Sequence, residues 1–398
     1  MSAADWRRTR LSRTVAIRSG RDFAAVDDPH GKFPVFGSGG RFARASEYLY
    51  SGHGVIFGRK GTIDRPIPVT GEFWVADTGY FVEPMPGLLD ARFLSYWSLR
   101  FPFRYYATDT ALPSMTRSDI GSEPIKLPPL STQVDIADYL DHETAEIDAL
   151  IADLDQFGGL LAERHYSMAT KLFASIDSET RSRPLGTMAT FISGGTPDTT
   201  VERFWADADS DVAFRWVAIS DMSGTDTIVD TVKSLTPMGL ADRRLQVAPP
   251  GTVLFAMYAS VGEVARLATA ATFNQAIIGI TPYPNVLDPT YLQRYLESAR
   301  PELLAEVRSN TQANLNAHQV RHFVIPTPEF SIQQQIAADI EFSLATLRSA
   351  QADLTLAIAL AKERRVALIT AAVTGQIDVT AKHRPAAEQL EDDIKELP

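Results

Sequence analysis

Hydrophobic residues recur at every seventh position in two segments of this chain, and this spacing predicts two long helices. The positions are Leu140, Ile147, Leu154, Leu161 and Met168 in the first segment, and Ile340, Leu347, Leu354, Ala361 and Leu368 in the second. Such spacing forms an apolar stripe along one side of a helix, as in a coiled coil. Because the two stripes have the same phase 200 residues apart, we expect the two helices to pack on each other.

The residues that open the two segments also match each other. Pro128, Ser131, Gln133 and Ile136 align with Pro328, Ser331, Gln333 and Ile336, and further upstream Leu89-Asp90 aligns with Leu287-Asp288. A proline ends the preceding domain, and the serine is expected to cap the helix that follows. The chain therefore contains an internal repeat, and each half is predicted to be a mixed α/β domain followed by a long helix.

The order of the repeats determines the direction of the helices. The first helix leads from the first domain to the second, so the second helix must run back if it packs along the first. The predicted fold class is α/β (α+β), with two similar mixed α/β domains, two long antiparallel coiled-coil helices and a pseudo-twofold internal repeat. The expected boundaries are 1–130 for the first domain, 131–176 for the first helix, 177–330 for the second domain, 331–380 for the second helix and 381–398 for an acidic C-terminal tail.

Composition excludes several classes of protein. Hydrophobic residues make up 45% and charged residues 22% of the 398 residues, which is typical of a soluble folded protein. The apolar stretches are too short to span a membrane. The absence of cysteine excludes disulfides, thiolate zinc sites and a cysteine nucleophile. We therefore expect a cytoplasmic protein that does not associate with membranes.

Charge is distributed unevenly along the chain, whose formal net charge is −11. Residues 1–130 carry 17 basic and 13 acidic side chains, whereas residues 184–330 carry 10 and 15. Contacts to DNA phosphates require clustered Lys and Arg. The charge thus argues against a general nucleic-acid binder, but it permits local basic patches, above all in the first domain.

Two segments resemble the specificity subunits of type I restriction-modification systems. They are LPPLSTQVDIADYLDHETAEIDALI (127–151) and ERRVALITAAVTGQIDV (363–379). The second is the more specific, because a helix that ends in Thr-Gly-Gln-Ile-Asp is a habit of this family. The resemblance covers nearly the whole chain, with weaker similarity at GRKGTI (58–63), ISGGTP (192–197), WVAISDM (216–222) and TQANLN (311–316).

The resemblance implies that each domain is a target-recognition domain for one half of a bipartite sequence in double-stranded DNA. It implies that the helices bind two copies of a DNA adenine methyltransferase, the modification subunit. Restriction subunits with ATP-driven translocase and nuclease activity would join that core. The chain itself would then carry no catalytic site, no metal and no cofactor.

In the first domain, the strongest candidate for a DNA contact is Arg59-Lys60, which lies between two glycines after an apolar run. Glycine lets the backbone approach a phosphate closely, and arginine can bind guanine through two hydrogen bonds. An ordinary solvated hairpin explains the loop equally well. Arg41 and Arg44 are further candidates for phosphate contacts.

In the second domain, the candidates are basic, hydroxyl and amide side chains. They are Arg243, Arg244 and Arg266, then Tyr258 and Ser260 at the position equivalent to the Arg59 loop, and the amides Asn274, Gln275, Gln312, Asn314 and Asn316. Amides can pair with adenine edges, but capping of loop backbone accounts for them at least as well. The Gln-x-Asn-Leu-Asn pattern at 312–316 is missing at 111–116, so side-chain roles cannot be transferred between the halves there.

Motifs that could carry catalysis have structural explanations. Asp288-Pro289-Thr290-Tyr291 is similar to the Asp-Pro-Pro-Tyr loop of adenine methyltransferases, but threonine replaces the second proline. An aspartate that caps a helix with proline at its first position explains it fully. The glycine-rich segments at 36–40 and 193–196 lack the Gly-Lys-Ser/Thr that binds phosphates, and the seven histidines show no metal-site spacing.

Three functions can be weighed on this basis. The leading hypothesis is a DNA-binding specificity subunit that also acts as a scaffold. A stand-alone methyltransferase or nuclease is disfavoured, because its motifs are missing. A coiled-coil scaffold that never binds DNA is the alternative that the acidic charge favours.

Overall fold

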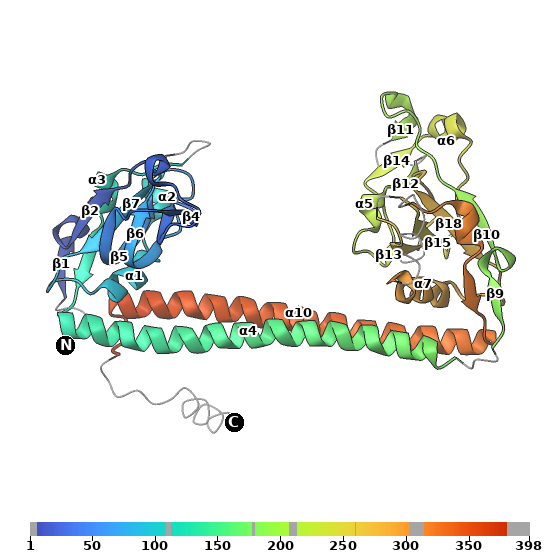
Figure 1. Cartoon of the computed structure of the whole chain (residues 1–398). Coiled ribbons are helices and arrows are strands. Elements are labelled where there is room, and N and C mark those ends of the chain that lie inside the picture. Colours follow the sequence, from blue (N-terminus) through green and yellow to red (C-terminus); the bar gives the residue numbers. More distant parts are fainter. Residues whose placement is uncertain are drawn as a thin grey trace, which may run out of the picture. The chain divides into compact units, whose positions relative to one another are not determined.

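The computed structural model describes residues 6–108, 113–176, 180–206, 213–258, 260–301 and 314–379 (Figure 1). The chain divides into two compact units, Met1–Asp155 with Thr355–Pro398 (unit 1) and Gln156–Leu354 (unit 2). Each unit holds one α/β domain and part of each long helix, α4 (Leu130–Ala174) and α10 (Phe330–Thr374). The acidic tail expected at 381–398 lies outside the described residues.

The domain of unit 1 is built on a six-stranded sheet in the order β2-β7-β5-β6-β3-β4. The strands are β2 (Val15–Ser19), β3 (Phe33–Gly37), β4 (Gly40–Ala45), β5 (Tyr50–Gly58), β6 (Ile67–Val75) and β7 (Gly79–Pro84). Neighbouring strands are antiparallel except β3 and β6, which pair in parallel. A separate ladder joins β1 (Arg7–Arg10) to β8 (Pro124–Leu127), the segment that leads into α4.

The apolar run at the end of β5 is buried on both faces of this sheet. Val55 and Phe57 lie in the core that contains Phe93 of helix α1, whereas Ile56 lies in a second core with Phe73. Side chains alternate between the faces of a strand, so a continuous apolar run needs cover on both sides. The helices of this domain are η2 (Leu11–Arg13), η3 (Ala24–Val26), α1 (Ala91–Ser98), α2 (Phe103–Tyr106) and α3 (Arg117–Ser122).

The domain of unit 2 contains two sheets, ordered β10-β18-β15-β16-β13 and β11-β14-β12-β17, and a ladder of β9 with β19. The strands are β9 (Ser182–Pro184), β10 (Ala189–Ser193), β11 (Trp205–Ala206), β12 (Phe214–Val217), β13 (Thr227–Ile228), β14 (Lys233–Leu235), β15 (Val253–Ala256), β16 (Val264–Leu267), β17 (Ala271–Phe273), β18 (Ile277–Pro282) and β19 (Val324–Pro326). The helices are η4 (Leu185–Thr187), η5 (Glu202–Phe204), α5 (Ile219–Met222), α6 (Pro237–Arg243), α7 (Pro289–Ser298) and α9 (Ala317–Arg321).

The two domains share one topology. β5 lies between β7 and β6 in unit 1, as β15 lies between β18 and β16 in unit 2. The parallel pair β3–β6 corresponds to the parallel pair β12–β17, because the strand that is continuous as β6 is divided into β16 and β17. The sequence repeat is therefore also a repeat of fold. β11 and β13 have no counterpart among the described strands of unit 1.

A buried glutamine joins each domain to the start of its long helix. Each side chain donates to two backbone carbonyls and accepts from one backbone amide, at 2.8 to 3.1 Å. The partners are Leu88, Pro128 and Asp90 for Gln133, and Val286, Pro328 and Asp288 for Gln333. Because a buried amide must be hydrogen-bonded, these contacts hold the chain where it enters each helix.

The serines that the sequence predicts as helix caps lie inside the first turn instead. The amides of Gln133 and Gln333 donate to the carbonyls of Pro129 and Glu329, both at 3.0 Å. The helices accordingly begin at Leu130 and Phe330, one residue before the serines. A serine cannot cap from inside the helix, since capping needs a residue with extended backbone before the first turn.

Within each unit the two long helices run antiparallel. Leu140, near the start of α4, shares the core of unit 1 with Ile369, near the end of α10. In unit 2 the pairing is reversed, with Ala169 of α4 in the same core as Ile340 of α10. The direction predicted from the chain connection is confirmed.

The predicted apolar stripe is most deeply buried where a domain packs on the helices. Leu140, Ile147, Ile340 and Ala361 are buried. The remaining stripe residues are half-buried, as two helices with solvent around them require: Leu154, Leu161, Met168, Leu347, Leu354 and Leu368. In the part of the chain that the structure describes, no helix has the length and apolar character needed to cross a membrane.

Candidate nucleic-acid interface

The loop after β5 holds two cations on a fixed backbone. The amides of Arg59 and Lys60 both donate to the Thr78 carbonyl, at 2.7 and 3.4 Å. Arg59 is half-buried, and its guanidinium donates to the Asp77 carbonyl and lies 5.9 Å from the centre of the Tyr80 ring. Lys60 is exposed. An exposed ammonium on a rigid loop suits a phosphate contact, which positions a protein on DNA.

The glycines of this loop are required by the fold itself. A Cβ on Gly58 would lie 2.4 Å from the carbonyl oxygen of Thr62. Gly61 has a φ of +83°, in the left-handed region that favours glycine, and its amide donates to the Pro113 carbonyl at 3.0 Å. The glycines thus have a structural explanation, and the candidate contacts of the loop are the two side chains between them.

Arg41 and Arg44 lie on the edge strand β4 in different environments. Arg44 donates to the backbone carbonyls of Gly31 and Lys32 and so holds the turn before β3. Arg41 is exposed. Arg44 therefore stabilises the domain, and Arg41 is the better placed of the two for a phosphate.

The structure adds an exposed aromatic residue that sequence analysis did not select. Tyr105 in α2 is 82% exposed. Its ring contacts Tyr106 edge-on, Tyr106 stacks on Phe101, and Phe101 contacts Phe57 and Trp97 in the core. A ring supported by packed rings loses little conformational freedom on binding. The aromatic run FPFRYY (101–106) was the available signal.

This aromatic residue belongs to a segment that pairs with the loop that carries Lys60. Lys60 forms an isolated β-bridge with Ser114, and the Ser114 amide donates to the Thr108 hydroxyl at 3.0 Å. Thr108 follows Tyr105 by three residues. The exposed cation and the exposed ring are thus tied to the same local structure.

The loop after β15 is the structural counterpart of the Arg59 loop. In unit 1 the Met115 amide donates to the Arg59 carbonyl at 3.1 Å, and in unit 2 the Leu315 amide donates to the Met257 carbonyl at 3.1 Å. The equivalence expected from the sequence thus extends to the backbone pairing.

Different side chains occupy the two equivalent loops. Tyr258 follows Met257 as Lys60 follows Arg59, and it is 36% exposed. Ser260 is half-buried. The second domain therefore presents a phenol where the first presents an ammonium.

Two of the three candidate arginines of the second domain interact with side chains of their own domain. Arg243 forms an ion pair with Asp242 at 3.3 Å. Arg266 donates to the buried Gln293 amide oxygen at 3.3 Å. Arg244 is exposed, and it ends α6 with a φ of +51°. Among these three, Arg244 is the most available for a phosphate.

Most amide candidates have partners within their own domain. Asn274 accepts from a backbone amide two residues further on, at 2.7 Å, and Asn316 caps α9 by accepting from the amide three residues further on, at 3.0 Å. Gln275 accepts from a threonine hydroxyl. Asn314 is exposed, and Gln312 lies outside the described residues. Backbone capping thus accounts for Asn274 and Asn316 without DNA.

The Asp288 motif forms a helix start. The Asp288 carboxylate accepts from the amides of Thr290 and Tyr291, both at 2.9 Å, with Pro289 in the first turn. Tyr291 is fully buried, and its hydroxyl donates to the Pro326 carbonyl at 2.9 Å. The capping explanation is confirmed.

A cluster of charges joins the second domain to α10. Arg294, only 4% exposed, forms ion pairs with Asp226, Glu297 and Glu341 at 2.6 to 3.0 Å, and Arg348 also pairs with Asp226. Burial raises the pKa of Glu297. A buried guanidinium is stable only when its donors are paired, so this cluster fixes the domain on its helix.

Tyr96 stands in unit 1 at the position that matches Arg294. The Tyr96 hydroxyl donates to Asp141 at 2.7 Å, and burial raises the pKa of Tyr96 to about 12. Arg92 adds exposed ion pairs with Asp138 and Asp141, both at 2.7 Å. The two domains therefore use the same helix position with different chemistry.

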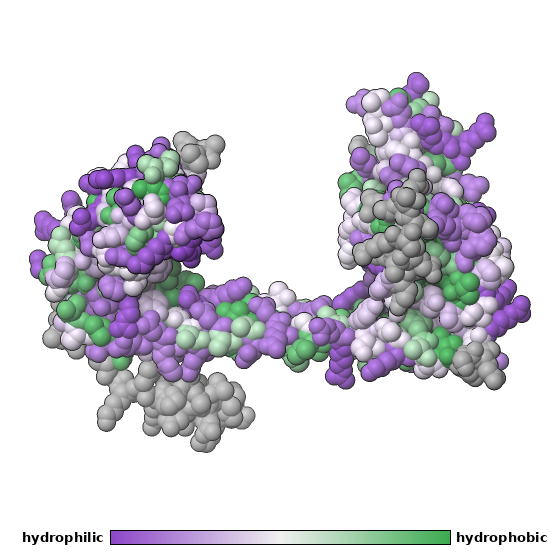
Figure 2. All heavy atoms as spheres, viewed as in Figure 1, coloured by the Kyte–Doolittle hydropathy of each residue, from purple (hydrophilic) through white to green (hydrophobic). Residues whose placement is uncertain are grey.

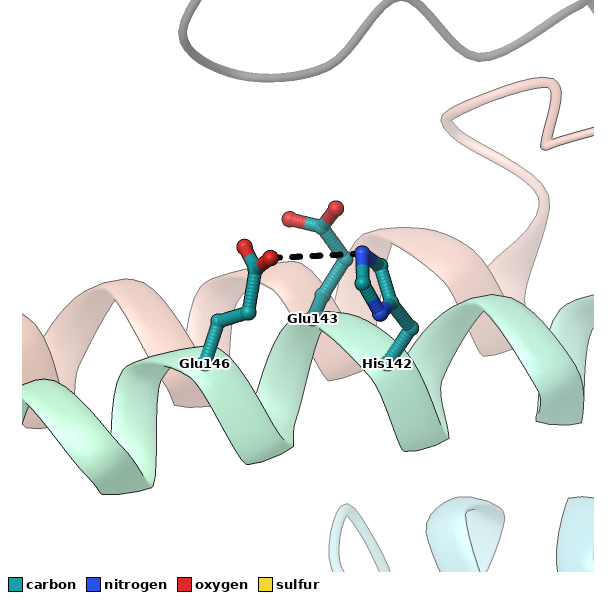
Figure 3. A group of neighbouring side chains, drawn as sticks. All are labelled: His142, Glu143 and Glu146. Carbon is teal, nitrogen blue, oxygen red and sulfur yellow. Dashed lines mark ion pairs between the residues drawn. The ribbon is translucent and has the colours of Figure 1, made fainter.

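Within the described residues, one group of side chains has the spacing to hold a metal ion. His142, Glu143 and Glu146 offer ligand atoms within 4.8 Å of one another on a solvent-facing side of α4 (Figure 3). The His142 Nε2 lies 3.3 Å from a Glu146 oxygen, an ion pair of residues one helical turn apart. That pairing explains the proximity of the groups.

Comparison with known proteins identifies the family. The sequence profile described as "Type I restriction modification DNA specificity domain" matches residues 4–155 and 178–342. The chain belongs to the specificity-subunit family of type I restriction-modification systems. The two matched segments correspond to the two halves of the internal repeat.

Two Escherichia coli relatives share this sequence similarity. The type I restriction enzyme EcoR124I/EcoR124II specificity subunit is 22% identical over 258 residues, which cover 62% of this chain and 61% of the relative. The EcoDI specificity subunit is 25% identical over 173 residues, 43% of this chain and 38% of the relative. The matched region thus spans less than two thirds of the length of either relative.

Two solved structures share the fold over most of the chain. The HsdS subunit from Thermoanaerobacter tengcongensis has a TM-score of 0.54 at 19% identity, covering 94% of this chain and 97% of that one. A chain from a structure on complex assembly and conformational transition of the type I R-M system has a TM-score of 0.69 at 18% identity, covering 94% and 98%. The predicted fold class, two α/β domains with two long helices, is confirmed.

Proposed function

We propose that this chain is the sequence-specific DNA-binding subunit of a type I restriction-modification complex and has no catalytic site of its own. The domains at 1–130 and 177–330 each bind one half of a bipartite target in double-stranded DNA. The helices at 131–176 and 331–380 bind two copies of a DNA adenine methyltransferase subunit, and restriction subunits join that core. The complex acts in the cytoplasm.

One observation carries the proposal: the two domains have equivalent loops that present different side chains. The chain also belongs to a family whose profile is described as a DNA specificity domain. The loops after β5 and β15 have the same backbone pairing, but one exposes Lys60 and the other Tyr258. Two different half-sites require equivalent surfaces whose side chains differ, since base edges are distinguished by the donors and acceptors that meet them.

The net charge of −11 limits what the chain can do alone. Acidic protein repels the phosphates, and a few exposed cations offset only part of this repulsion. The isolated chain should therefore bind DNA weakly, and a complex with the modification subunit should bind tightly. Nanomolar, site-specific binding by the chain alone at physiological salt would contradict this.

Co-expression with a modification subunit, followed by mapping of methylated adenines in host DNA, tests the proposal. A bipartite methylation motif that requires both chains is the expected result. Methylation by this chain alone would show a stand-alone enzyme. A stable complex without methylation or DNA binding would show a scaffold that does not bind DNA.

A further inference from the structure

The ladder of β1 with β8 carries a group of cations on its outer face. Arg8 and Lys126 are directly opposite each other in the ladder, and Arg10 lies two residues further along β1. Residues two apart on a strand point to the same face of it, as do residues directly opposite on neighbouring strands. On the other face, Ile125 and Leu127 pack on the core of unit 1. The three cations therefore point away from that core.

No acidic side chain of the described residues pairs with these cations. Arg8 and Arg10 are exposed and Lys126 is half-buried, and within the described residues none of their side chains forms an ion pair. Residues 7–21 hold six arginines and no aspartate or glutamate, and Lys126 is the only charged residue in 124–131. In Figure 2 the left edge of this domain, where Figure 1 places β1, shows hydrophilic side chains beside apolar ones. Unpaired positive charge thus remains on a surface of a chain whose net charge is −11.

The ladder of β9 with β19 in unit 2 shows that the fold does not require these cations. A buried leucine follows β1 and β9 alike, and its amide donates to the carbonyl of Glu123 in unit 1, at 2.9 Å, and of Phe323 in unit 2, at 2.8 Å. These contacts align the two ladders residue by residue. The outer face of unit 2 is then uncharged, with Ser182, Pro184 and Pro326 at the three positions. Like charges directly opposite each other destabilise a ladder, so folding does not explain the cations of unit 1.

One short helix connects this ladder to the candidate DNA loop of the same domain. The Met115 amide donates to the Arg59 carbonyl at 3.1 Å, and the chain then forms α3 and enters β8. Six helical residues and three extended ones span at most about 20 Å, the length of about six base pairs of DNA. Arg117 of α3 and Arg13 of η2 are exposed, and α3 packs against η2. Exposed cations therefore continue from the loop to the ladder.

We propose that the outer face of the β1–β8 ladder is a second DNA site, which binds phosphates of duplex DNA outside the target, beside the half-site of the first domain. This inference rests on the proposed function, which brings a duplex to the loop after β5. Phosphate contacts position a protein on DNA and carry no sequence information. The site therefore adds affinity without adding specificity. It does so on one side of the target only, because the equivalent face of unit 2 is uncharged.

The first experiment measures how DNA length affects binding by the complex of this chain with the modification subunit. Once methylation mapping has given the target, three duplexes are compared: the target alone, and the target extended by about ten base pairs on one side or on the other. Only the extension beside the half-site that depends on Arg59 and Lys60 should raise the affinity. The triple variant R8S/R10S/K126S should lose this gain. Equal gains from both extensions, or a gain that survives the triple substitution, would overturn the inference.

The second measurement counts the phosphate contacts through the salt dependence of binding. Each lost contact should reduce the slope of log K against log salt concentration by about 0.9. Three lost contacts should make the loss of affinity between roughly 50 and 200 mM salt about fortyfold smaller in the triple variant than in the wild type. The methylated sequence should stay the same, because no base contact is lost. Lys32→Ser, which removes an exposed cation of the same domain, is the control and should keep the wild-type slope.

The internal repeat supplies a variant with the opposite expectation. S182R/T187R places arginines in unit 2 at the positions that match Arg8 and Arg13. The extension on the other side of the target should then raise the affinity as well. If this variant is folded and gains nothing from that extension, the ladder face does not reach flanking DNA.

The remaining outcomes separate this inference from the proposed function. Thermal melting checks the fold, and the triple variant should melt at the wild-type temperature or slightly above it, because directly opposed like charges are removed. A folded triple variant that binds the modification subunit more weakly, with an unchanged salt slope for DNA, would assign the face to a protein partner and overturn the inference. A wild-type complex that binds no duplex at all would contradict the proposed function itself.

Discussion

Arg41 and Arg44 lie three residues apart on β4, yet only Arg41 extends into solvent. Arg44 bonds two backbone carbonyls of its own domain, and Asn274 and Asn316 are likewise bonded within theirs. Exposure therefore divides the candidates into those that stabilise a domain and those that are available to DNA. Lys60 and Tyr105 belong to the second group.

Replacing Arg59 and Lys60 with alanine should weaken recognition of one half-site by about 1 to 3 kcal/mol for each base contact that is lost. The loop backbone is held by amide contacts to Thr78, so the protein should remain folded. Lys32→Ala, which removes an exposed cation of the same domain, is the control. Methylation mapping measures the effect. If methylation at both half-sites is unchanged, the loop does not contact DNA and is an ordinary solvated hairpin.

Tyr105→Ala should weaken DNA binding by the complex by about 1 to 3 kcal/mol, because an exposed ring on a rigid support is suited to contact a base or sugar. Tyr105→Phe should keep most of the affinity. Tyr48→Ala, at a tyrosine of the same domain that is 48% exposed, provides the comparison. Equal affinities for wild type and Tyr105→Ala in a binding titration would remove this residue from the interface.

Sequence patterns predicted the positions of these loops better than the roles of their side chains. The Asp288 cap was predictable, because aspartate before proline has one favoured geometry. At the end of each domain, the mismatch between 111–116 and 312–316 suggested that side-chain roles differ, but the structure shows one shared role. Thr116 and Asn316 both cap a short helix through the same capping box, although the residues before them do not match. Exposure of Tyr105 depends on packing of distant rings, which no local pattern encodes.

At the scale of elements, the join between each domain and its helix is the most closely repeated structure. Gln133 and Gln333 make equivalent contacts to three backbone groups. Their alignment was visible in the sequence, but their function was not, because two of the three partners of each glutamine lie 43 to 47 residues upstream.

Gln333→Ala should lower the free energy of unfolding by about 1 to 3 kcal/mol or more, because it leaves a buried amide and two carbonyls without partners. Gln334→Ala, at an exposed position beside it, should have little effect. Denaturant unfolding of both variants measures the difference. If the two variants have the same stability, the glutamine contact does not hold the domain.

The helix pair of unit 2 should lose stability in mild acid. His165 is half-buried, with its Nδ1 3.0 Å from the Ser343 hydroxyl, and burial together with Arg294 and Arg348 lowers its pKa from the ordinary 6.5. The folded state thus favours neutral histidine, and its contribution is present above pH 6.5 and lost as the pH falls through the lower folded pKa. His165→Gln should reduce this loss. Unfolding curves at several pH values give the dependence of the free energy of unfolding on pH. If this dependence is the same for the wild type and His165→Gln, His165 is not the cause.

At the scale of the whole molecule, the proposed function makes helix length a determinant of the DNA target. If each domain binds one half-site, the gap between half-sites depends on the number of helical residues between the domains. Unequal charge of the domains affects the strength of each contact, whereas helix length affects the separation of the half-sites and, through the helical rotation of about 100° per residue, the orientation of the domains.

Inserting four residues after Leu154 in α4, and four more at the facing level near Ala359 in α10, should widen the gap while both half-sites keep their sequence. Four residues add about 6 Å of helix, and DNA rises about 3.4 Å per base pair, so the gap should grow by about one or two base pairs. An insertion in α4 alone should abolish assembly, because it moves the apolar stripe out of register. Methylome sequencing distinguishes these outcomes, and an active double insertion with its original gap would refute the role of helix length.

The glutamine contacts also bear on how such a chain can change over generations. The side-chain hydrogen bonds of Gln133 and Gln333 described above all join main-chain atoms, and every amino acid except proline supplies the same amide and carbonyl. The join therefore makes no demand on the side chains of the incoming domain at those positions. A genetic exchange that replaces one domain with a divergent relative of the same backbone would keep the helix start intact. Under the proposed function, such an exchange would change the DNA specificity without a compensating mutation at Gln133 or Gln333, whereas side-chain contacts such as Arg294 with Glu341 would have to be kept or replaced together.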